Sequence, residues 1–425
     1  MLTSIVGINW GDEGKGRMVD LLSENQDVIV RYQGGNNAGH TVVNDKGSFV
    51  LNLLPSGILR ADKVNVMGNG MVIDLQHLCG EIERLHNAGV EITPKNLLIS
   101  DKAVVCCPFD VAQDCLEEDR LADRKFGSTR RGISPVYADK YMKKAIRMGD
   151  LLHLEYLKSR LETIVEWKNL ILCGAYGSEP FTVEQMLAWF EKYGTPLIPY
   201  ITDAGSYINK ALDEGKNVML EAQLGALRDI DFGIYPFTTS SSTVTAYGPV
   251  GAGIPNRKVD GAVGVMKAYS TCVGEGPFTA ELFGDEGEFL RKAGNEYGAA
   301  TGRPRRVGAF DVVASRYGCV MQAATEIALT KLDVLDVMDK IPVCVSYNVD
   351  GREVKDFPSG EALNKATPNI VYMDGWKTST ADVRRYEDLP ENARKYIEFI
   401  EQQIGYPITM VSNGPEREAI IYRNK

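Results

Sequence analysis

Short apolar runs rich in β-branched residues alternate along the chain with segments whose apolar residues recur at helical spacing. The strand-like runs are residues 2–8, 27–32, 63–67, 217–221, 262–266, 326–329 and 342–346. Helical spacing is found at residues 17–22, 75–86, 154–165, 183–193 and 285–291. Because this alternation is typical of βαβ connections, the pattern predicts an α/β fold with a mostly parallel central sheet covered by helices.

Two stretches depart from the alternation and predict smaller subdomains. Residues 107–213 are richer in helical patterns and in charge, so we expect a helix-rich subdomain inserted there. From residue 342 onward short strands and turns predominate, which favours a C-terminal α+β subdomain over residues 342–425 with antiparallel pairing. The sequence has no internal repeat and no long linker, so we interpret residues 1–425 as one unit.

The composition restricts what the chain can bind. Its formal net charge is −10, whereas a general binder of nucleic acids or of membrane surfaces needs an extended basic face. No apolar run approaches the length of a bilayer span, and the first basic residue is Lys15, so we expect neither a membrane segment nor a secretory signal. The eight cysteines lack CxxC spacing, so we interpret them as reduced, mostly packing residues of a cytoplasmic protein.

A glycine-rich turn, Gly11-Asp12-Glu13-Gly14-Lys15-Gly16, directly follows the first predicted strand. Its glycines allow the backbone to approach a phosphate closely, while Lys15 and the start of the next helix supply positive charge. It is not a Walker A loop, because Arg17-Met18 stand where that pattern needs lysine followed by serine or threonine. Asp12 is a candidate magnesium ligand or base, although an aspartate in a turn also commonly binds its own backbone.

A second glycine-rich loop, residues 34–41, follows the predicted strand at 27–32. It carries His40, whereas the other three histidines lie in helical patterns. A loop histidine is more often structural than catalytic, but beside an acidic residue from another strand-end loop it can act as a general acid. His40 is therefore a candidate catalytic residue.

Two charged segments further along the chain suit a nucleotide or an anion. Thr330-Lys331-Leu332-Asp333 follows an apolar strand, and a carboxylate there can accept two hydrogen bonds from guanine, which adenine cannot donate. Gly302-Arg303-Pro304-Arg305-Arg306 places three arginines within four residues, which suits bidentate capture of a carboxylate or a phosphate. A chance tetrapeptide and a solvated basic loop are the simpler interpretations of these two segments.

Taken together, these motifs resemble those of adenylosuccinate synthetases. The first glycine loop, preceded by Asn9-Trp10, and Asn37-Ala38-Gly39-His40-Thr41 in the second are similar to the two signature loops of that family. Further similar segments follow in the family's order over nearly the whole chain: Leu54-Pro55-Ser56-Gly57-Ile58, Lys267-Ala268-Tyr269-Ser270-Thr271, Gly276-Pro277-Phe278, Thr330-Lys331-Leu332-Asp333 and Asn413-Gly414-Pro415. Several long matches in the same order are very specific.

The resemblance implies a ligase with a P-loop-like GTP site. Such an enzyme joins L-aspartate to inosine monophosphate (IMP) through a 6-phosphoryl-IMP intermediate, giving adenylosuccinate, GDP and phosphate in the first committed step from IMP to AMP. By the same resemblance Asp12 is the base that deprotonates N1 of the purine and a ligand of Mg²⁺, and the carbonyl of Gly39 completes the metal shell. His40 is implied as the general acid, and Lys15 holds the nucleotide phosphates.

The family's binding residues carry over position by position. Implied GTP contacts are Gly11, Asp12, Glu13, Gly14, Lys15, Gly16, Arg17, Gly39, His40, Thr41, Arg305, Lys331, Leu332, Asp333, Ser412, Asn413 and Gly414. Implied IMP contacts are Asp12, Glu13, Gly14, Lys15, Asn37, Ala38, Gly39, His40, Thr129, Lys143, Gln223, Thr239 and Arg303. Implied L-aspartate contacts are Ala299, Ala300, Thr301, Gly302, Arg303, Pro304 and Arg305.

The chain departs from the family at several positions. Glu221-Ala222-Gln223-Leu224-Gly225 stands where many members have Glu-Gly-Ala-Gln-Gly, so the glutamine that touches the purine 6-oxygen is displaced by one residue. Gln223 is our candidate for this catalytic contact. Lys143 stands where a family arginine reaches the IMP of the neighbouring subunit, and a lysine keeps the charge but not the forked geometry. Histidine, glycine, threonine and arginine of the family are replaced here by Asn36, Arg130, Ala300 and Pro304.

The resemblance implies a homodimer whose small-molecule substrates are IMP, L-aspartate and GTP, and two other functions stay open. One is a sister enzyme on the same scaffold that aminates another purine nucleotide, such as the deoxyguanylate-using relatives of some phages, which tend to alter the residue matching Asp12. The other is a regulatory GTP-binding switch, which would need a Walker A hydroxyl on Mg²⁺ and would hydrolyse GTP alone. An interaction protein without chemistry would leave both glycine loops unexplained.

Overall fold

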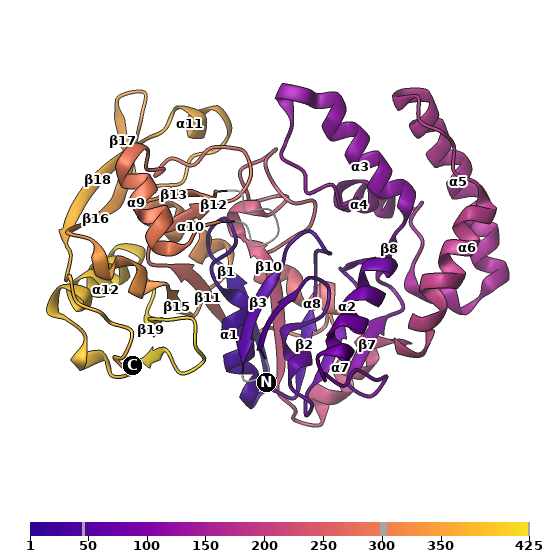
Figure 1. Cartoon of the computed structure of the whole chain (residues 1–425), viewed down its shortest axis with the longest axis horizontal. Helices are drawn as coiled ribbons and strands as arrows, with labels where there is room; N and C mark the ends of the chain where they lie inside the picture. The colour runs from indigo at the N-terminus through magenta and orange to yellow at the C-terminus, as the bar shows by residue number, and fades with distance from the viewer. Residues whose placement is uncertain (45–46, 298–303, 424–425) are drawn as a thin grey trace.

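The computed structural model describes residues 1–44, 47–297 and 304–423, and its centre is one large sheet (Figure 1). In these residues ten strands pair in the order β20, β19, β15, β11, β1, β10, β2, β5, β7 and β9. Along the chain they are β1 (Leu2–Gly7), β2 (Val28–Arg31), β5 (Val64–Met67), β7 (Leu97–Ser100), β9 (Ile201–Thr202), β10 (Val218–Gly225), β11 (Gly261–Lys267), β15 (Glu326–Thr330), β19 (Ile408–Ser412) and β20 (Ile420–Tyr422). All neighbours are parallel except β19 and β20, which confirms the mostly parallel sheet predicted from the sequence.

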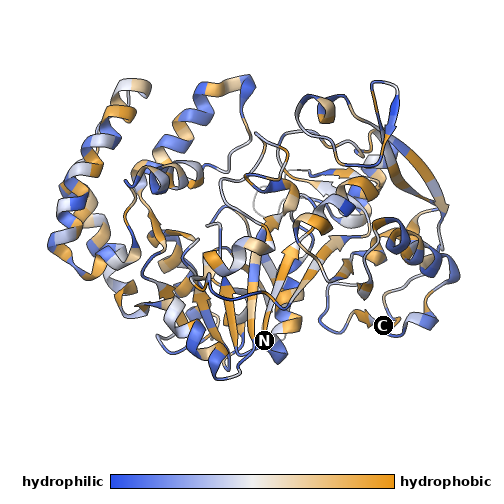
Figure 2. Cartoon of the chain, turned by 180° about the vertical axis from the view of Figure 1, so that it is seen from behind, coloured by the Kyte–Doolittle hydropathy of each residue, from blue (hydrophilic) through white to orange (hydrophobic). Residues whose placement is uncertain are grey.

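The central strands bury both faces of this sheet, because their side chains alternate between two apolar clusters. On β10, Val218 and Leu220 point to one face, while Met219 points to the other. Helices α7 (Ala204–Asp213) and α8 (Gly248–Ala252) cover the first face, and α1 (Lys15–Leu22) covers the second. Figure 2 shows the consequence, since the central strands are the most continuously hydrophobic part of the chain.

The remaining elements surround this sheet. The other helices are α2 (Leu75–Asn87), α3 (Pro108–Leu121), α4 (Ile133–Met142), α5 (Leu154–Tyr176), α6 (Val183–Gly194), α9 (Gly284–Gly294), α10 (Val312–Met321), α11 (Gly360–Lys365) and α12 (Glu391–Ile404). Small sheets are formed by β3 (His40–Asn44) with β4 (Gly47–Leu51), β6 (Val72–Asp74) with β8 (Val104–Cys106), β12 (Ser270–Cys272) with β13 (Arg306–Gly308), and β14 (Phe310–Asp311), β16 (Lys340–Val349), β17 (Arg352–Val354) and β18 (Thr367–Asp374). None of the helices in the described ranges has the length and apolarity needed to cross a bilayer, and all eight cysteines are free thiols.

The C-terminal part differs from its sequence pattern. Short strands and turns were predicted after residue 342, but the chain there forms the long strand β16 and the amphipathic helix α12. Ala393, Ile397 and Ile400 of α12 are fully buried, at spacings of four and three residues. Strands β19 and β20 then rejoin the central sheet. The predicted boundaries of the subdomains, at residues 107, 213 and 342, stay a prediction.

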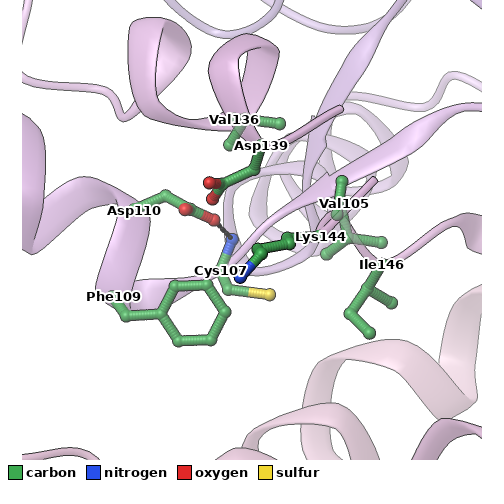
Figure 3. A pocket seen from close by; sticks show the side chains of 9 residues that line it. Val105, Cys107, Phe109, Asp110, Val136, Asp139, Lys144 and Ile146 are labelled. Atoms are coloured by element: carbon green, nitrogen blue, oxygen red, sulfur yellow. Dashed lines mark hydrogen bonds between the residues drawn. The ribbon is translucent and has the colours of Figure 1, made fainter. Parts of the chain in front are cut away.

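A buried ion cluster joins three helices at the far end of the molecule from the C-terminus (Figure 1). The ammonium of Lys168 on α5 lies 2.7 Å from Asp110 on α3 and 2.5 Å from Asp139 on α4, and all three side chains are inaccessible or nearly so. Figure 3 shows the two carboxylates facing each other, with the backbone N–H of Cys107 donating to Asp110. Burial raises the pKa of Asp110 to about 7, because one ammonium compensates two carboxylates.

We expect Lys168→Met to lower the free energy of unfolding by ~3–5 kcal/mol, because it leaves two buried carboxylates without a cation. The loss is expected to be larger at pH 8 than at pH 5, because burial raises the pKa of Asp110 above its unfolded value, so lowering the pH protonates it and stabilises the folded variant. Chemical denaturation at both pH values measures it. Lys158→Met, at an exposed position of the same helix, is the control and should change stability by less than ~0.5 kcal/mol. An equal loss in both variants, or no pH dependence, would contradict the expectation.

Candidate active site

The loops predicted from the sequence to bind phosphate all leave the central sheet at one edge (Figure 1). Because the strands are parallel, the loop after β1, the end of β10, the loop after β2 and the segments after β11, β15 and β19 emerge side by side. Strand β1 lies between β10 and β11. The strands that follow β1 in the chain are first added on its β10 side, and β11, β15 and β19 are then added on its other side. Such a switch in strand order is the usual position of a ligand-binding crevice in an α/β sheet.

The carboxylate of Glu13 organises the loop after β1. Its Oε1 accepts hydrogen bonds from the backbone N–H groups of Asn9, at 3.1 Å, and Gly11, at 2.8 Å, and its Oε2 accepts one from the Lys15 ammonium at 2.6 Å. Both Glu13 and Lys15 are almost inaccessible to solvent. The loop is a tight turn, with left-handed backbone at Gly11, Asp12 and Gly14. Asp12 is the side chain that this turn leaves at the surface of the crevice, one third exposed.

His40 begins strand β3, just after the glycine-rich loop in which the sequence placed it, and its side chain is buried. Its Nδ1 donates to Oε1 of Glu221 at 2.5 Å, and a carboxylate can only accept, so Nδ1 carries the proton. Ser56 fixes Glu221 with its backbone N–H at 2.8 Å and its hydroxyl at 2.7 Å. Burial lowers the pKa of His40, while its bond to Glu221 acts in the opposite direction.

Gln223 lies in β10 and supports the loop after β2 from behind. Its Oε1 accepts from the backbone N–H of Gly35 at 3.1 Å, and its Nε2 donates to the carbonyl of Gly35 at 3.0 Å and to that of Ala38 at 3.4 Å. The side chain is fully buried. The Oδ1 of Asn37 accepts from the same Gly35 N–H at 3.2 Å. The structure therefore engages both ends of the Gln223 amide with the loop that carries Asn37, Ala38 and Gly39.

Arg305 approaches the turn from the other side. Its Nε lies 3.2 Å from Oδ2 of Asp12, and its Nη1 donates to Oε2 of the buried Glu296 at 2.9 Å. Pro304 beside it is exposed. The other predicted aspartate contacts, Ala299, Ala300, Thr301, Gly302 and Arg303, lie outside the described residues.

A second polar pocket surrounds the start of α1. Asp333 and Asn413 each have a buried Oδ1 without a hydrogen-bond partner in the structure, and burial raises the pKa of Asp333. Arg17 ties the pocket to α1, because its guanidinium donates to Oγ of Ser412 and to the carbonyl of Ala419 at 2.8 Å. Lys331 has left-handed backbone and donates to the carbonyl of Gly294 at 3.1 Å. Leu332 is buried beneath them, and Gly414 accepts from Ser412 at 3.3 Å.

The structure places the three remaining predicted contacts differently. Thr239 is buried with an unpartnered Oγ1, and its neighbour Ser240 bonds Ser134 of α4 at 2.7 Å. Thr129 is exposed just before α4. Lys143 ends α4 with left-handed backbone and projects to the surface beside the exposed Tyr141. Thr239 is thus close to α4 through its neighbour Ser240, and Lys143 at the end of the same helix has no described side-chain partner.

A divalent cation could be held here only with help from a ligand. In the described residues, no group of three or more histidine, cysteine, aspartate or glutamate side chains is arranged around a common point. The exposed backbone of Gly39 and the partly exposed carboxylate of Asp12 supply hard oxygen donors. This set fits Mg²⁺, which usually takes several of its ligands from phosphate oxygens and water.

Local sequence patterns did not show that buried carboxylates pair with the cations and the histidine of the site. Glu221, Glu296 and Glu13 are almost or fully inaccessible, and each accepts from a cationic or imidazole group of the site. The available sequence signal was a carboxylate at the end of an apolar strand, as at Glu221, since such a residue is buried only when it is paired. Glu296 follows a helix and carries no comparable signal.

Comparison with known proteins gives one consistent result. A family model described as adenylosuccinate synthetase matches residues 4–421. The chain is 45% identical over 425 residues to an adenylosuccinate synthetase of Caldanaerobacter subterraneus, covering 100% of this chain and 99% of that protein. The structure is similar to that of fully ligated adenylosuccinate synthetase from Plasmodium falciparum, with a TM-score of 0.93, 36% identity and 99% of each chain covered. It shares its fold with a cyanophage S-2L succinoaminodeoxyadenylate synthetase bound to dGMP and dATP, at a TM-score of 0.62 and 18% identity, over 100% of this chain and 95% of that one.

Gly16 leaves no room for a side chain between α1 and β3. A Cβ at this position would lie 2.7 Å from Cβ of His40, so we expect Gly16→Ala to destabilise the protein by ~1–3 kcal/mol and to displace His40. Gly80→Ala is the matched control: that helical glycine has open space around it, so alanine should stabilise by ~0.5–1 kcal/mol. Urea denaturation measures both variants, and a Gly16→Ala protein as stable as the wild type would refute the close packing.

Proposed function

The chain belongs to the adenylosuccinate synthetase family of purine-biosynthesis ligases, and from this premise we propose that it joins L-aspartate to IMP with GTP as the phosphoryl donor. The products are adenylosuccinate, GDP and phosphate, and 6-phosphoryl-IMP is the intermediate. The observation that carries the proposal is the juxtaposition of Asp12, His40 and the buried Glu13–Lys15 pair at the crevice of the sheet.

The preference for GTP is supported by the pocket around Asp333. Its buried Oδ1 and that of Asn413 lack donors, and a buried acceptor left unpaired costs free energy. Guanine offers adjacent N–H donors on its ring and its exocyclic amine, whereas adenine has an acceptor at the ring position. Lys331 and Leu332 flank the Asp333 carboxylate. We propose that these residues, together with Ser412, Asn413 and Gly414, form the guanine pocket.

In the first step Asp12 takes the proton from N1 of IMP, and the 6-oxygen attacks the γ-phosphorus of GTP as GDP leaves. In the second step the amine of aspartate attacks C6, and phosphate departs and takes up the proton that the amine releases. Activation is needed because an oxo group is a poor leaving group whereas phosphate is a good one. Most of the rate acceleration then comes from positioning and charge neutralisation.

His40 is proposed to stabilise the phosphoryl group during its transfer. Glu221 accepts from Nδ1, so it fixes the ring and favours the imidazolium, whose Nε2–H can donate to a phosphoryl oxygen. Lys15, together with the backbone N–H groups from Gly11 to Arg17 and of Gly39 to Thr41, would hold the phosphates. Asp12 and the carbonyl of Gly39 would hold Mg²⁺, which neutralises charge on the phosphates when it is bound.

The remaining roles follow from placement. Asn37, Ala38, Thr129 and Thr239 are proposed to contact IMP, and the unpartnered Oγ1 of Thr239 supplies a free hydroxyl. Gln223 would act through the loop after β2, which it holds. Residues Ala299 to Arg305 are proposed to bind aspartate, with Arg303 and Arg305 on its carboxylates. Arg303 would also contact IMP, and Arg305 would reach GTP.

We also propose that the protein acts as a cytoplasmic homodimer. Lys143 and its neighbours Tyr141 and Met142 are exposed at one end of α4. A cation at this position, with apolar side chains around it, fits the family arrangement in which this side chain reaches the IMP phosphate of the second subunit. Free cysteines throughout the chain agree with a reducing compartment.

The sister reaction on another purine nucleotide is the second candidate. The cyanophage enzyme bound to dGMP and dATP has the same fold, but its identity to this chain is too low to carry its substrates over. Retention of Asp12 favours IMP, because the deoxyguanylate-using relatives tend to alter the residue at this position.

We expect product formation, followed by ultraviolet absorbance, only when IMP, GTP, Mg²⁺ and L-aspartate are all present. Omission of any one should reduce the rate to background, and ATP in place of GTP should support far less turnover. A parallel assay with dGMP in place of IMP tests the sister reaction. GTP hydrolysis without aspartate and IMP would instead indicate a regulatory switch and would contradict the proposal.

We expect Asp12→Asn to abolish turnover, at least ~10³-fold, because an amide cannot accept the N1 proton. The melting temperature should stay close to that of the wild type, since Asp12 is one third exposed and its ion-pair partner, the partly exposed Arg305, keeps its bond to Glu296. Asp62→Asn, at an exposed surface carboxylate, is the control and should keep normal kcat. Near-normal activity of Asp12→Asn would remove this residue as the base.

A further inference from the structure

Glu296 is a fully buried carboxylate that collects three donors at the border of the site. Its Oε1 accepts from the Lys267 ammonium at 2.8 Å and from the Tyr269 hydroxyl at 2.5 Å, and its Oε2 accepts from Nη1 of Arg305 at 2.9 Å. Burial alone would raise the pKa of Glu296, but the Lys267 ammonium and these hydrogen bonds lower it to about 2. The group is therefore a permanent anion.

The backbone next to Glu296 also holds Arg305, in addition to the bond between their side chains. The N–H of Arg305 donates to the carbonyl of Glu296 at 2.9 Å, and Tyr297 and Pro304 pair across an antiparallel bridge. Nε of Arg291 in α9 donates to the carbonyl of Arg305 at 2.9 Å. Arg305 is thus held at its backbone and at one edge of its guanidinium, and Nε of the guanidinium remains toward Asp12.

The four charges around this point are balanced only with Glu296 present. Lys267 and Arg305 are the cations, and Glu296 and Asp12 are the anions. Burial lowers the pKa of Lys267, while its interactions with Glu296 and Asp12 favour the charged form, and its ammonium lies 2.8 Å from Glu296. If Glu296 lost its charge, Asp12 would be the anion left to compensate both cations, and a buried cation without a partner is costly. Arg305 is already within 3.2 Å of Asp12 and has the shortest distance to move.

We propose that Glu296 is a positioning residue: it holds Arg305 in place to receive a carboxylate of the amino-acid substrate and keeps both buried cations from closing on Asp12. This inference rests on the proposed function, in which Arg305 binds aspartate. It assigns Glu296 its largest effect on aspartate and a smaller one on GTP, which Arg305 is also proposed to reach, whereas no described residue proposed above to contact IMP bonds its carboxylate. A purely structural ion cluster would have no such selectivity.

Steady-state kinetics of Glu296→Gln test the selectivity. We expect kcat/KM for aspartate to fall ~10- to 100-fold, while KM for IMP changes by less than about threefold and KM for GTP changes less than KM for aspartate. Glu296→Asp keeps the charge and should recover part of the loss. Glu288→Gln, at a half-exposed carboxylate of α9 that pairs with Arg291, is the matched control and should leave all constants unchanged.

A milder variant covers the case in which Glu296→Gln does not fold. Tyr269→Phe removes one donor to Glu296 and retains the ring, so it should raise KM for aspartate by about two- to fivefold with little change for the nucleotides. Equal changes for all three substrates, or a loss of thermal stability with normal kinetic constants in either variant, would overturn the proposal.

A crystal structure of ligand-free Glu296→Gln, or of Tyr269→Phe if that is the variant that folds, separates this inference from the proposed function. In the glutamine variant Arg305 should turn and pair with Asp12 through two nitrogens; in the phenylalanine variant Glu296 should shift from its present position against Arg305. Unmoved side chains would refute the positioning role even in a fully active enzyme. Absence of aspartate-dependent turnover in the wild type would instead refute the function, whatever the variant structure shows.

Discussion

Strand β1 pairs in parallel with β10 on one side and β11 on the other, and the geometry of the whole site depends on this pairing. The register sets Ile5 opposite Glu221 and Gly7 opposite Val265. Because parallel strands end at the same edge, the turn that carries Asp12 emerges between β10, which carries Glu221, and β11, which ends in Lys267. The approach is so close that a Cβ on Gly7 would lie 2.7 Å from Glu13 and 2.8 Å from Lys15. The close packing of the central strands therefore also fixes the positions of the charged groups Glu13 and Lys15.

Buried carboxylates compensate the cations and the imidazole that face this crevice. Glu13 pairs with Lys15, Glu221 with His40, and Glu296 with Arg305. Lys15, His40 and Arg305 are each held by a buried carboxylate on the side away from the crevice. Their other N–H groups can then face the crevice. An anionic ligand then completes a charge arrangement that is already ordered, which reduces the reorganisation needed on binding.

The sequence predicted the parallel sheet and the glycine turn well, because both follow from local patterns. Every predicted strand has a counterpart within a few residues, and α5 continues to Tyr176 beyond the predicted end at residue 165. Helix α12 was missed although its buried residues have helical spacing, since it lies among strands and turns. His40 was expected in a loop because the glycines before it suggested one. Pairing of β3 with β4 and the contact with Glu221 depend on residues far apart in the chain, which local patterns do not reveal.

The displaced glutamine shows how one residue of register changes chemistry. Between Ile5 and Gly7 of β1 the pairing with β10 jumps from Glu221 to Gly225, so β10 carries a bulge there. Leu224 adopts left-handed backbone in this bulge, and its side chain packs near Gly11, beside the turn of Asp12. Neighbouring strand residues face opposite directions, so a glutamine one position earlier meets the loop after β2 instead of the crevice. In this chain the Gln223 amide holds the backbone of Gly35 from within, and the apolar Leu224 lies beside the turn of Asp12. Under the proposed function, the purine 6-oxygen would then meet other groups at this edge, and the turn of Asp12 and the Glu221-anchored His40 are candidates.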